Sequence, residues 1–166
     1  MSIGTKYVND DSRRLLRDVI YELDHVLIAS ISAIGVPYAG WLVTQSGVVL
    51  KIASEMVEIE DRFEVGRLVV EFDVEPPSHA DRFAIPPDWR NVSAIESLHV
   101  VERPPWSQAG DGGVDVEAGI RFRLSDGRAW SVVVGAQPCT LAIDAPFAPV
   151  VAYPQYKKGD YKAVPL

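Results

Sequence analysis

Acidic side chains are concentrated in the stretch from Glu55 to Glu75, where carboxylates could serve catalysis or binding. This stretch holds eight acids and two bases, a balance of −6 within a formal net charge of −7 for the 166-residue chain. Carboxylates act as general acids or bases where a pocket shifts their pKa, or they attract a basic partner through complementary charge. The alternation of these acids with apolar residues predicts a solvated sheet face without a pocket, which favours binding of a partner over catalysis. The carboxylates predicted to form this partner-binding face are Glu58, Glu60, Glu71, Asp73 and Glu75.

A simpler interpretation of the same acids also fits the sequence. Runs of charge often form only a solvated surface, and charged side chains discourage unwanted pairing at the edge of a sheet. In that case the acids keep the protein soluble and bind nothing.

The histidines and the cysteine do not form a recognisable catalytic or ligand cluster. His79 and Asp81 are close in sequence, but a metal site needs three or four convergent ligands. His99 lies in an apolar stretch and is predicted to be a hydrogen-bonded core residue, and the lone Cys139 a small buried apolar one. The chain has no phosphate-binding glycine loop, GxSxG, HExxH or CxxC motif. We therefore predict no catalytic residues, no metal and no cofactor, and favour a non-enzymatic protein.

Two alternating runs must position the acids. Val57 and Ile59 alternate with glutamates, and residues 68–75 alternate apolar and acidic side chains, which is typical of half-buried strands. Gly66 lies between the runs and can adopt turn conformations. The stretch is therefore predicted to be an antiparallel pair of strands.

The N-terminal stretch from Asp11 to about Leu23 predicts an amphipathic helix. Its apolar residues fall at helical spacing, and Asp or Ser can cap its first turn. We expect this helix to pack on a sheet. The apolar positions are Leu15, Leu16, Val19, Ile20 and Leu23.

Further strands are predicted along the rest of the chain. Asp126-Gly127 is a favoured hairpin turn and predicts that residues 120–124 pair with 129–134. The proline-rich residues 76–90 predict an irregular loop, and residues 92–102 fit neither helix nor strand well. Additional strands are expected at 25–34, 39–44, 48–53 and 140–143, with a turn at 45–47.

These patterns predict an α+β fold that is mainly antiparallel β. We expect a single sheet or roll of about six to eight strands, with the one N-terminal amphipathic helix packed on it. Residues 1–166 are predicted to form a single globular domain, with about 155–166 as a frayed tail.

Composition excludes several classes of partner. The acidic balance argues against nucleic-acid binding, which needs a basic surface. Residues 26–50 lack charge but are rich in turn residues, which argues against a membrane span. A single cysteine forms no internal disulfide, which fits a cytoplasmic location.

We expect a protein-binding domain, for example a bacterial immunity-type inhibitor that docks a basic toxin or nuclease through its acidic sheet face. One alternative is a small-molecule-binding β-roll walled by the four tryptophans. Another is a hydrolase or isomerase built from dispersed Asp, Glu and His. A deep pocket with His79 or His99 beside a carboxylate would favour the enzyme, and a flat acidic patch the binding protein. A homo-oligomer is compatible with the sequence.

Overall fold

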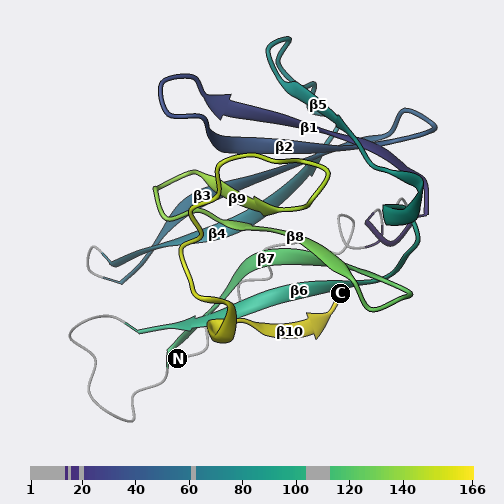
Figure 1. Cartoon of the computed structure of the whole chain (residues 1–166). Helices are drawn as coiled ribbons and strands as arrows, with labels where there is room; N and C mark the ends of the chain where they lie inside the picture. Colours follow the sequence, from purple (N-terminus) through teal and green to yellow (C-terminus); the bar gives the residue numbers. More distant parts are fainter. Residues whose placement is uncertain (1–13, 15, 19–20, 61–62, 104–112) are drawn as a thin grey trace.

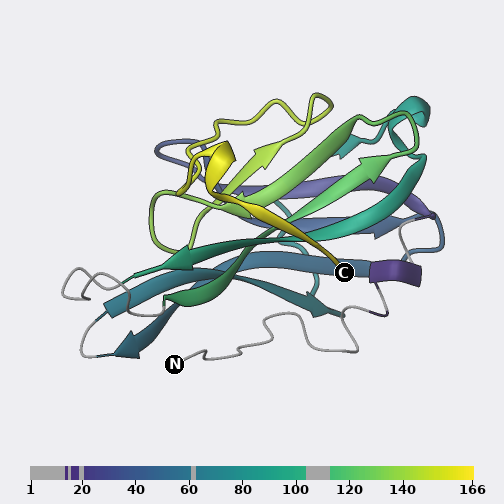
Figure 2. The same cartoon turned by 90° about the horizontal axis from the view of Figure 1, so that it is seen from below.

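Two antiparallel sheets of five strands each are the framework of this protein, and Figures 1 and 2 show them as two layers. The computed structural model describes residues 14, 16–18, 21–60, 63–103 and 113–166, and only the backbone of residues 59 and 60. The sheets contact each other where β4 meets β7 and β8 and where β2 meets β9. The arrangement among these residues is a β-sandwich.

The first sheet has the strand order β4-β3-β2-β1-β5. Its central strand, β2, is almost wholly buried on both faces, since one face meets the second sheet and a loop covers part of the other. In that loop the carbonyl of Val74 accepts a hydrogen bond of 3.0 Å from Trp41 Nε1. The strands are β1 (Leu23–Ile31), β2 (Val36–Thr44), β3 (Val49–Glu60), β4 (Phe63–Phe72) and β5 (Asp81–Ala84).

The second sheet has the strand order β10-β6-β7-β8-β9. Its longest strands, β6 and β7, pair over most of their lengths, with shifts of register after Val92 and Leu98. Two short 3-10 helices, η1 (Pro87–Trp89) and η2 (Lys158–Asp160), interrupt the connections. The strands are β6 (Val92–Glu102), β7 (Val114–Leu124), β8 (Ala129–Val134), β9 (Leu141–Asp144) and β10 (Lys162–Pro165).

The core lies between the sheets and is centred on aromatic rings. Phe122 stacks on Trp130 at 4.1 Å between ring centroids, and the rings of Trp130 and Phe147 meet edge to face at 5.2 Å. Along β7 every second residue is buried against this core, as the alternation of a strand requires. These buried β7 residues are Val114, Val116, Ala118, Ile120, Phe122 and Leu124.

Three predicted strand pairs are confirmed. Ile120 pairs with Val132 across the Asp126-Gly127 turn, where Gly127 has a φ of 91° that favours glycine. β2 and β3 pair across the predicted turn at 45–47, and β3 pairs with β4. The two runs predicted at 48–53 and 55–60 are one continuous strand, β3.

The prediction of an N-terminal amphipathic helix packed on the sheet is wrong. Part of the stretch lies outside the described residues. Of the rest, Arg14 and residues 16–18 are helical, residues 21–22 form a turn and a bend, and Leu23 already begins β1. A short helix needs tertiary packing to be stable. Leu16 and Leu23 are both buried, so the apolar spacing identified core residues without determining their backbone conformation.

The predicted single sheet or roll is also wrong, and the fold is nearly all β. Ten strands with apolar faces need a cover that one short helix cannot supply, and the second sheet supplies it. The segment predicted to be an irregular loop contains β5, which pairs with β1. The tail predicted to fray ends in β10, which pairs with β6. Within the described part of the chain, no helix is long and apolar enough to cross a membrane.

Candidate functional site

The exposed acids of β3 and β4 lie in two groups and not on one sheet face. Glu58 pairs with Glu64, whereas Glu71 pairs with Lys51. Side chains alternate along a strand, and Glu64 and Glu71 are seven positions apart, so they project from opposite faces of β4. At about 3.4 Å per residue, roughly 24 Å separates them along the strand.

The carboxylates beyond β4 no longer follow the alternation on which the prediction depended. Asp73 comes directly after the strand and has a φ of 60°, in the left-handed region, which ends the strand geometry. The hairpin-end group therefore comprises Glu58 and Glu64, and the strand-end group comprises Glu71, Asp73 and Glu75; all five side chains are exposed.

The remaining predicted residue, Glu60, lies at the far end of β3. A shift of register separates it from Glu58, and its backbone pairs with Phe63; its side chain lies outside the described residues. Elsewhere on these strands Arg67 forms an ion pair with Glu55. Among the described side chains of residues 49–75, the acids outside this ion pair are therefore the five of the two groups.

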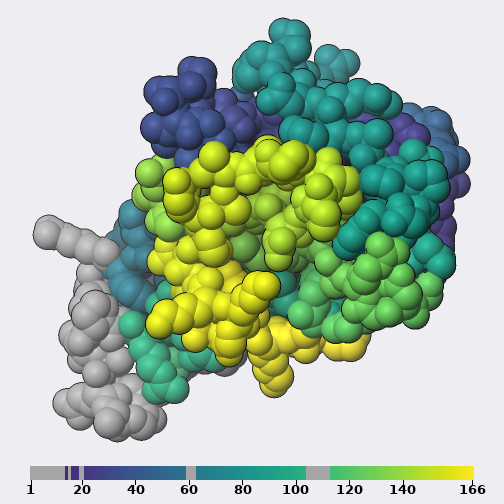
Figure 3. All heavy atoms as spheres, viewed as in Figure 1, coloured from purple at the N-terminus to yellow at the C-terminus, as the bar shows by residue number. Residues whose placement is uncertain are grey.

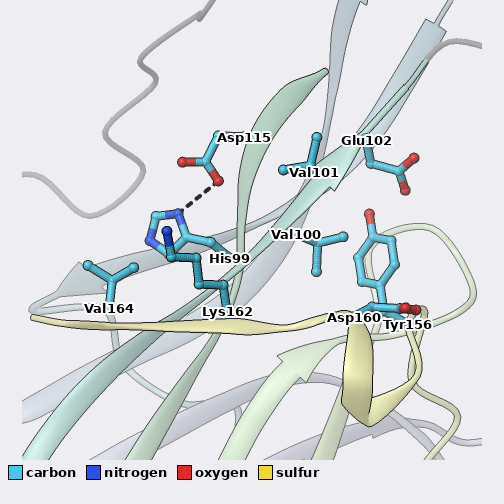
Figure 4. Close-up of a pocket in the computed structure, with 9 residues that line it drawn as sticks. All are labelled: His99, Val100, Val101, Glu102, Asp115, Tyr156, Asp160, Lys162 and Val164. Atoms are coloured by element: carbon cyan, nitrogen blue, oxygen red, sulfur yellow. Dashed lines mark hydrogen bonds and ion pairs between the residues drawn. The ribbon is translucent and has the colours of Figure 1, made fainter. Parts of the chain in front are cut away.

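An open groove of about 730 Å³ lies where the ends of β6 and β7 meet β10 and the C-terminal segment (Figure 4). Its lining combines apolar, acidic and basic side chains. Cross-strand pairing places Lys162 opposite His99, so β10 completes one wall. The lining residues are His99, Val100, Val101, Glu102, Asp115, Tyr156, Asp160, Lys162 and Val164.

A chain of hydrogen bonds runs from this groove into the protein. His99 Nδ1 lies 3.0 Å from Asp115 Oδ1, and His99 Nε2 lies 2.9 Å from Ser97 Oγ. The Ser97 hydroxyl donates a bond of 2.5 Å to Glu117 Oε1. Ser97 and Glu117 are each 1 % exposed, whereas His99 and Asp115 reach the groove.

The connectivity of Ser97, His99 and Asp115 matches that of a hydrolytic triad, but the proton positions differ. In a triad the serine donates its proton to the histidine. Here the single proton of Ser97 is directed to Glu117 Oε1, so it is not available to His99 Nε2. Because Ser97 is also buried, this geometry binds the ring of His99 in place and does not present a nucleophile to a substrate.

A phenol and a carboxylate form the other end of the groove. Burial raises the pKa of Tyr156, and a hydrogen bond to Glu102 raises it further. The phenol therefore stays protonated and donates to the Glu102 carboxylate. Glu102 also lines a cleft of about 180 Å³ together with Glu64. The hairpin-end group is thus joined to the groove through Glu102.

The other sequence candidates lie apart from this groove. His79 Nε2 lies 3.3 Å from the hydroxyl of Tyr38, and no carboxylate takes part in this contact. The third histidine, His25, hydrogen-bonds to Asp24 and lowers the pKa of that carboxyl. Cys139, predicted to be buried, is exposed. Among the described residues, no group of His, Cys, Asp and Glu could hold a metal ion.

The residues around His99 were missed for a physical reason. Ser97 and His99 are two apart in β6, and Asp115 and Glu117 are two apart in β7, so pairing of the strands brings both sets together. The register shift between Leu98 and His99 interrupts the alternation and made residues 92–102 ambiguous. Polar residues two positions apart occur in both strands, at 97 and 99 and at 115 and 117, and this repeated spacing was the signal in the sequence that could have identified the site.

Comparison with known proteins adds no relative. No family model, no curated protein and no solved structure matches this chain.

Proposed function

We propose that this chain is a non-enzymatic protein-binding domain that docks a basic protein through its acidic strands. The observation that carries the proposal is the exposure of all five carboxylates in the hairpin-end and strand-end groups. A basic partner would be steered toward them at long range and oriented by complementary charge.

The spacing of the two groups is compatible with a single partner. A standard interface covers about 800 Å² on each protein, which is a patch roughly 30 Å across. The separation along β4 of roughly 24 Å falls within this width. Because β4 is the edge strand of its sheet, one partner packed along this edge could contact both groups although they project from opposite faces. The cleft at Glu102 extends the acidic surface toward the groove.

The partner class follows from the charge. A toxin or nuclease that binds nucleic acid carries a basic surface, because phosphate binding depends on Lys and Arg. A surface bearing spaced carboxylates resembles that target in charge. Inhibition of such an enzyme by an immunity-type protein is the activity that this surface fits best.

A triple variant tests the docking surface. Glu58→Gln, Glu71→Gln and Asp73→Asn together remove three negative charges, and asparagine also tolerates the positive φ at position 73. Partners captured from native lysate by the wild type are identified, and their association is timed by surface plasmon resonance. We expect association of a basic partner to slow about tenfold at low ionic strength. High salt should slow the wild type similarly, because the screening length falls below about 10 Å above 0.1 M.

A matched control changes the same charge elsewhere. Asp18→Asn, Asp81→Asn and Asp88→Asn alter three other exposed carboxylates, so this variant has the same net charge as the docking variant. It should associate at nearly the wild-type rate. Equal rates for wild type and docking variant, unchanged by salt, would mean that the acids serve only solubility.

A hydrolase is the second candidate, favoured by the position of His99 beside Asp115 in the groove. His99→Gln separates the two functions, because His99, and not the buried Ser97, lines the groove. Activity toward a chromogenic ester that disappears in this variant, while the fold persists, would favour the hydrolase. Partner binding that survives the same substitution would favour the docking domain.

A further inference from the structure

A second cavity lies on the outer face of the second sheet, beneath the C-terminal segment. Its volume is about 690 Å³, within the range of about 300–1,000 Å³ typical of small-molecule sites. Figure 3 shows the C-terminal segment in yellow on this side of the molecule, with green atoms of the sheet visible between its turns. The cavity is separate from the acidic groups of β4, so its role does not rest on the proposed docking function.

Cross-strand pairing divides the floor of the cavity into a polar row and an apolar row. Arg121 pairs with Ser131, which pairs with Asp144. In the neighbouring row, Leu98 and Val133 pack together on the same face. A ligand lying across both rows would meet hydrogen-bonding groups at one end and apolar side chains at the other.

The charge of the lining is positive, in contrast to the protein as a whole. Arg121, Lys157 and Lys158 line the cavity together with the single carboxylate of Asp144. Both lysines are exposed and belong to the C-terminal segment that forms the roof. In a chain of net charge −7 this concentration of cations favours an anionic ligand.

The carboxylate nearest to Arg121 does not reverse this balance. Glu96 binds both Arg121 and Arg123, so two guanidinium groups share one carboxylate. Burial acts to raise the pKa of Glu96, but the hydrogen bonds from the two arginines outweigh it and hold the pKa below its usual value. The cluster therefore keeps a net positive charge at the border of the cavity.

We propose that this cavity binds a small amphipathic anion. Its carboxylate or phosphate lies near Lys157 and Lys158, and its apolar body lies on Leu98 and Val133. The aromatic rings of Tyr156 and Tyr161, which meet edge to face at 6.0 Å between centroids, form part of the roof.

Three probes with the same apolar chain test the chemistry of the ligand. Decanoate, decanol and decylammonium are titrated into the full chain by calorimetry. A charge-assisted hydrogen bond contributes about 1.5–3 kcal/mol, so decanoate should bind at least about tenfold more tightly than the alcohol or the amine. Backbone amide NMR signals of Ser131 and Val133 should shift on saturation. Equal affinity for all three probes, or shifts confined to other regions, would overturn the proposal.

Substitutions locate the site. Ser131→Phe places a bulky ring over the floor and should abolish decanoate binding, while Lys157→Gln and Lys158→Gln should each weaken it several-fold. Arg82→Gln removes one exposed positive charge from the other sheet and should bind decanoate like the wild type. A β-type circular dichroism spectrum confirms folding of each variant. If Ser131→Phe misfolds, the two lysine variants still decide: affinity unchanged in both refutes the site.

Discussion

The Glu96 carboxylate joins two neighbouring arginines of β7, and its removal should measurably destabilise the fold. Its oxygens accept hydrogen bonds from Arg121 Nε at 2.6 Å and from Arg123 Nε at 3.1 Å. The Glu96 side chain is only 17 % exposed, so solvent screens these bonds incompletely. Glu96→Gln keeps the volume but places an amide donor beside two guanidinium donors.

The size of the effect follows from the number and exposure of these bonds. Each hydrogen bond to a charged group contributes about 1.5–3 kcal/mol, but bonds that share one carboxylate are not additive. The arginines are themselves 31 % and 41 % exposed, which reduces the gain. We expect Glu96→Gln to lower the free energy of unfolding by about 2 kcal/mol. For a domain of this length, Tm should fall by about 4–8 °C.

The pH dependence supplies a second test of the same reasoning. The pKa of Glu96 is lower in the folded protein than its ordinary value of 4.5, so its stabilising effect is fully present above pH 4.5. It is lost as the pH falls through the folded-state pKa. The difference in the free energy of unfolding between wild type and Glu96→Gln should therefore be constant near neutral pH and shrink in acid.

Urea unfolding followed by circular dichroism, between neutral pH and pH 3, measures this difference. Asp81→Asn removes one exposed carboxylate and serves as the control, with an expected change within about 0.5 kcal/mol. The reasoning fails if Glu96→Gln is as stable as Asp81→Asn at neutral pH. It also fails if the difference does not change in acid.

Two further substitutions test the hairpin and the core. Gly127→Ala should cost about 1–2 kcal/mol in urea unfolding, because an alanine at a φ of 91° is strained even though no atom lies within 4 Å of its Cβ. A stability equal to the wild type would show that the turn relaxes freely. Trp130→Ala should cost about 3–5 kcal/mol and remove much of the near-ultraviolet dichroism, since Trp130 stacks on Phe122 in the core. A loss below 1 kcal/mol would contradict the central position of this ring.

The features that depend on neighbours along the chain could be predicted from the amino-acid sequence. The Asp126-Gly127 turn and the alternation on either side were enough to predict the β7–β8 hairpin, because turn chemistry and strand period are local. The same local signals located β3 and β4 and their exposed carboxylates. The N-terminal prediction failed because apolar spacing reports burial and not backbone conformation: among the described residues Leu16 is buried, and so is Leu23, which lies in a strand.

How these elements combine depends on long-range packing and could not be predicted from local patterns. The positive φ of Asp73 and the odd spacing between Glu64 and Glu71 divided the expected acidic face into two groups. The chain from Asp115 through His99 to Ser97 exists because β6 and β7 pair across a shift of register. Such contacts depend on strand order and register, which arise from how the apolar faces of distant strands cover each other.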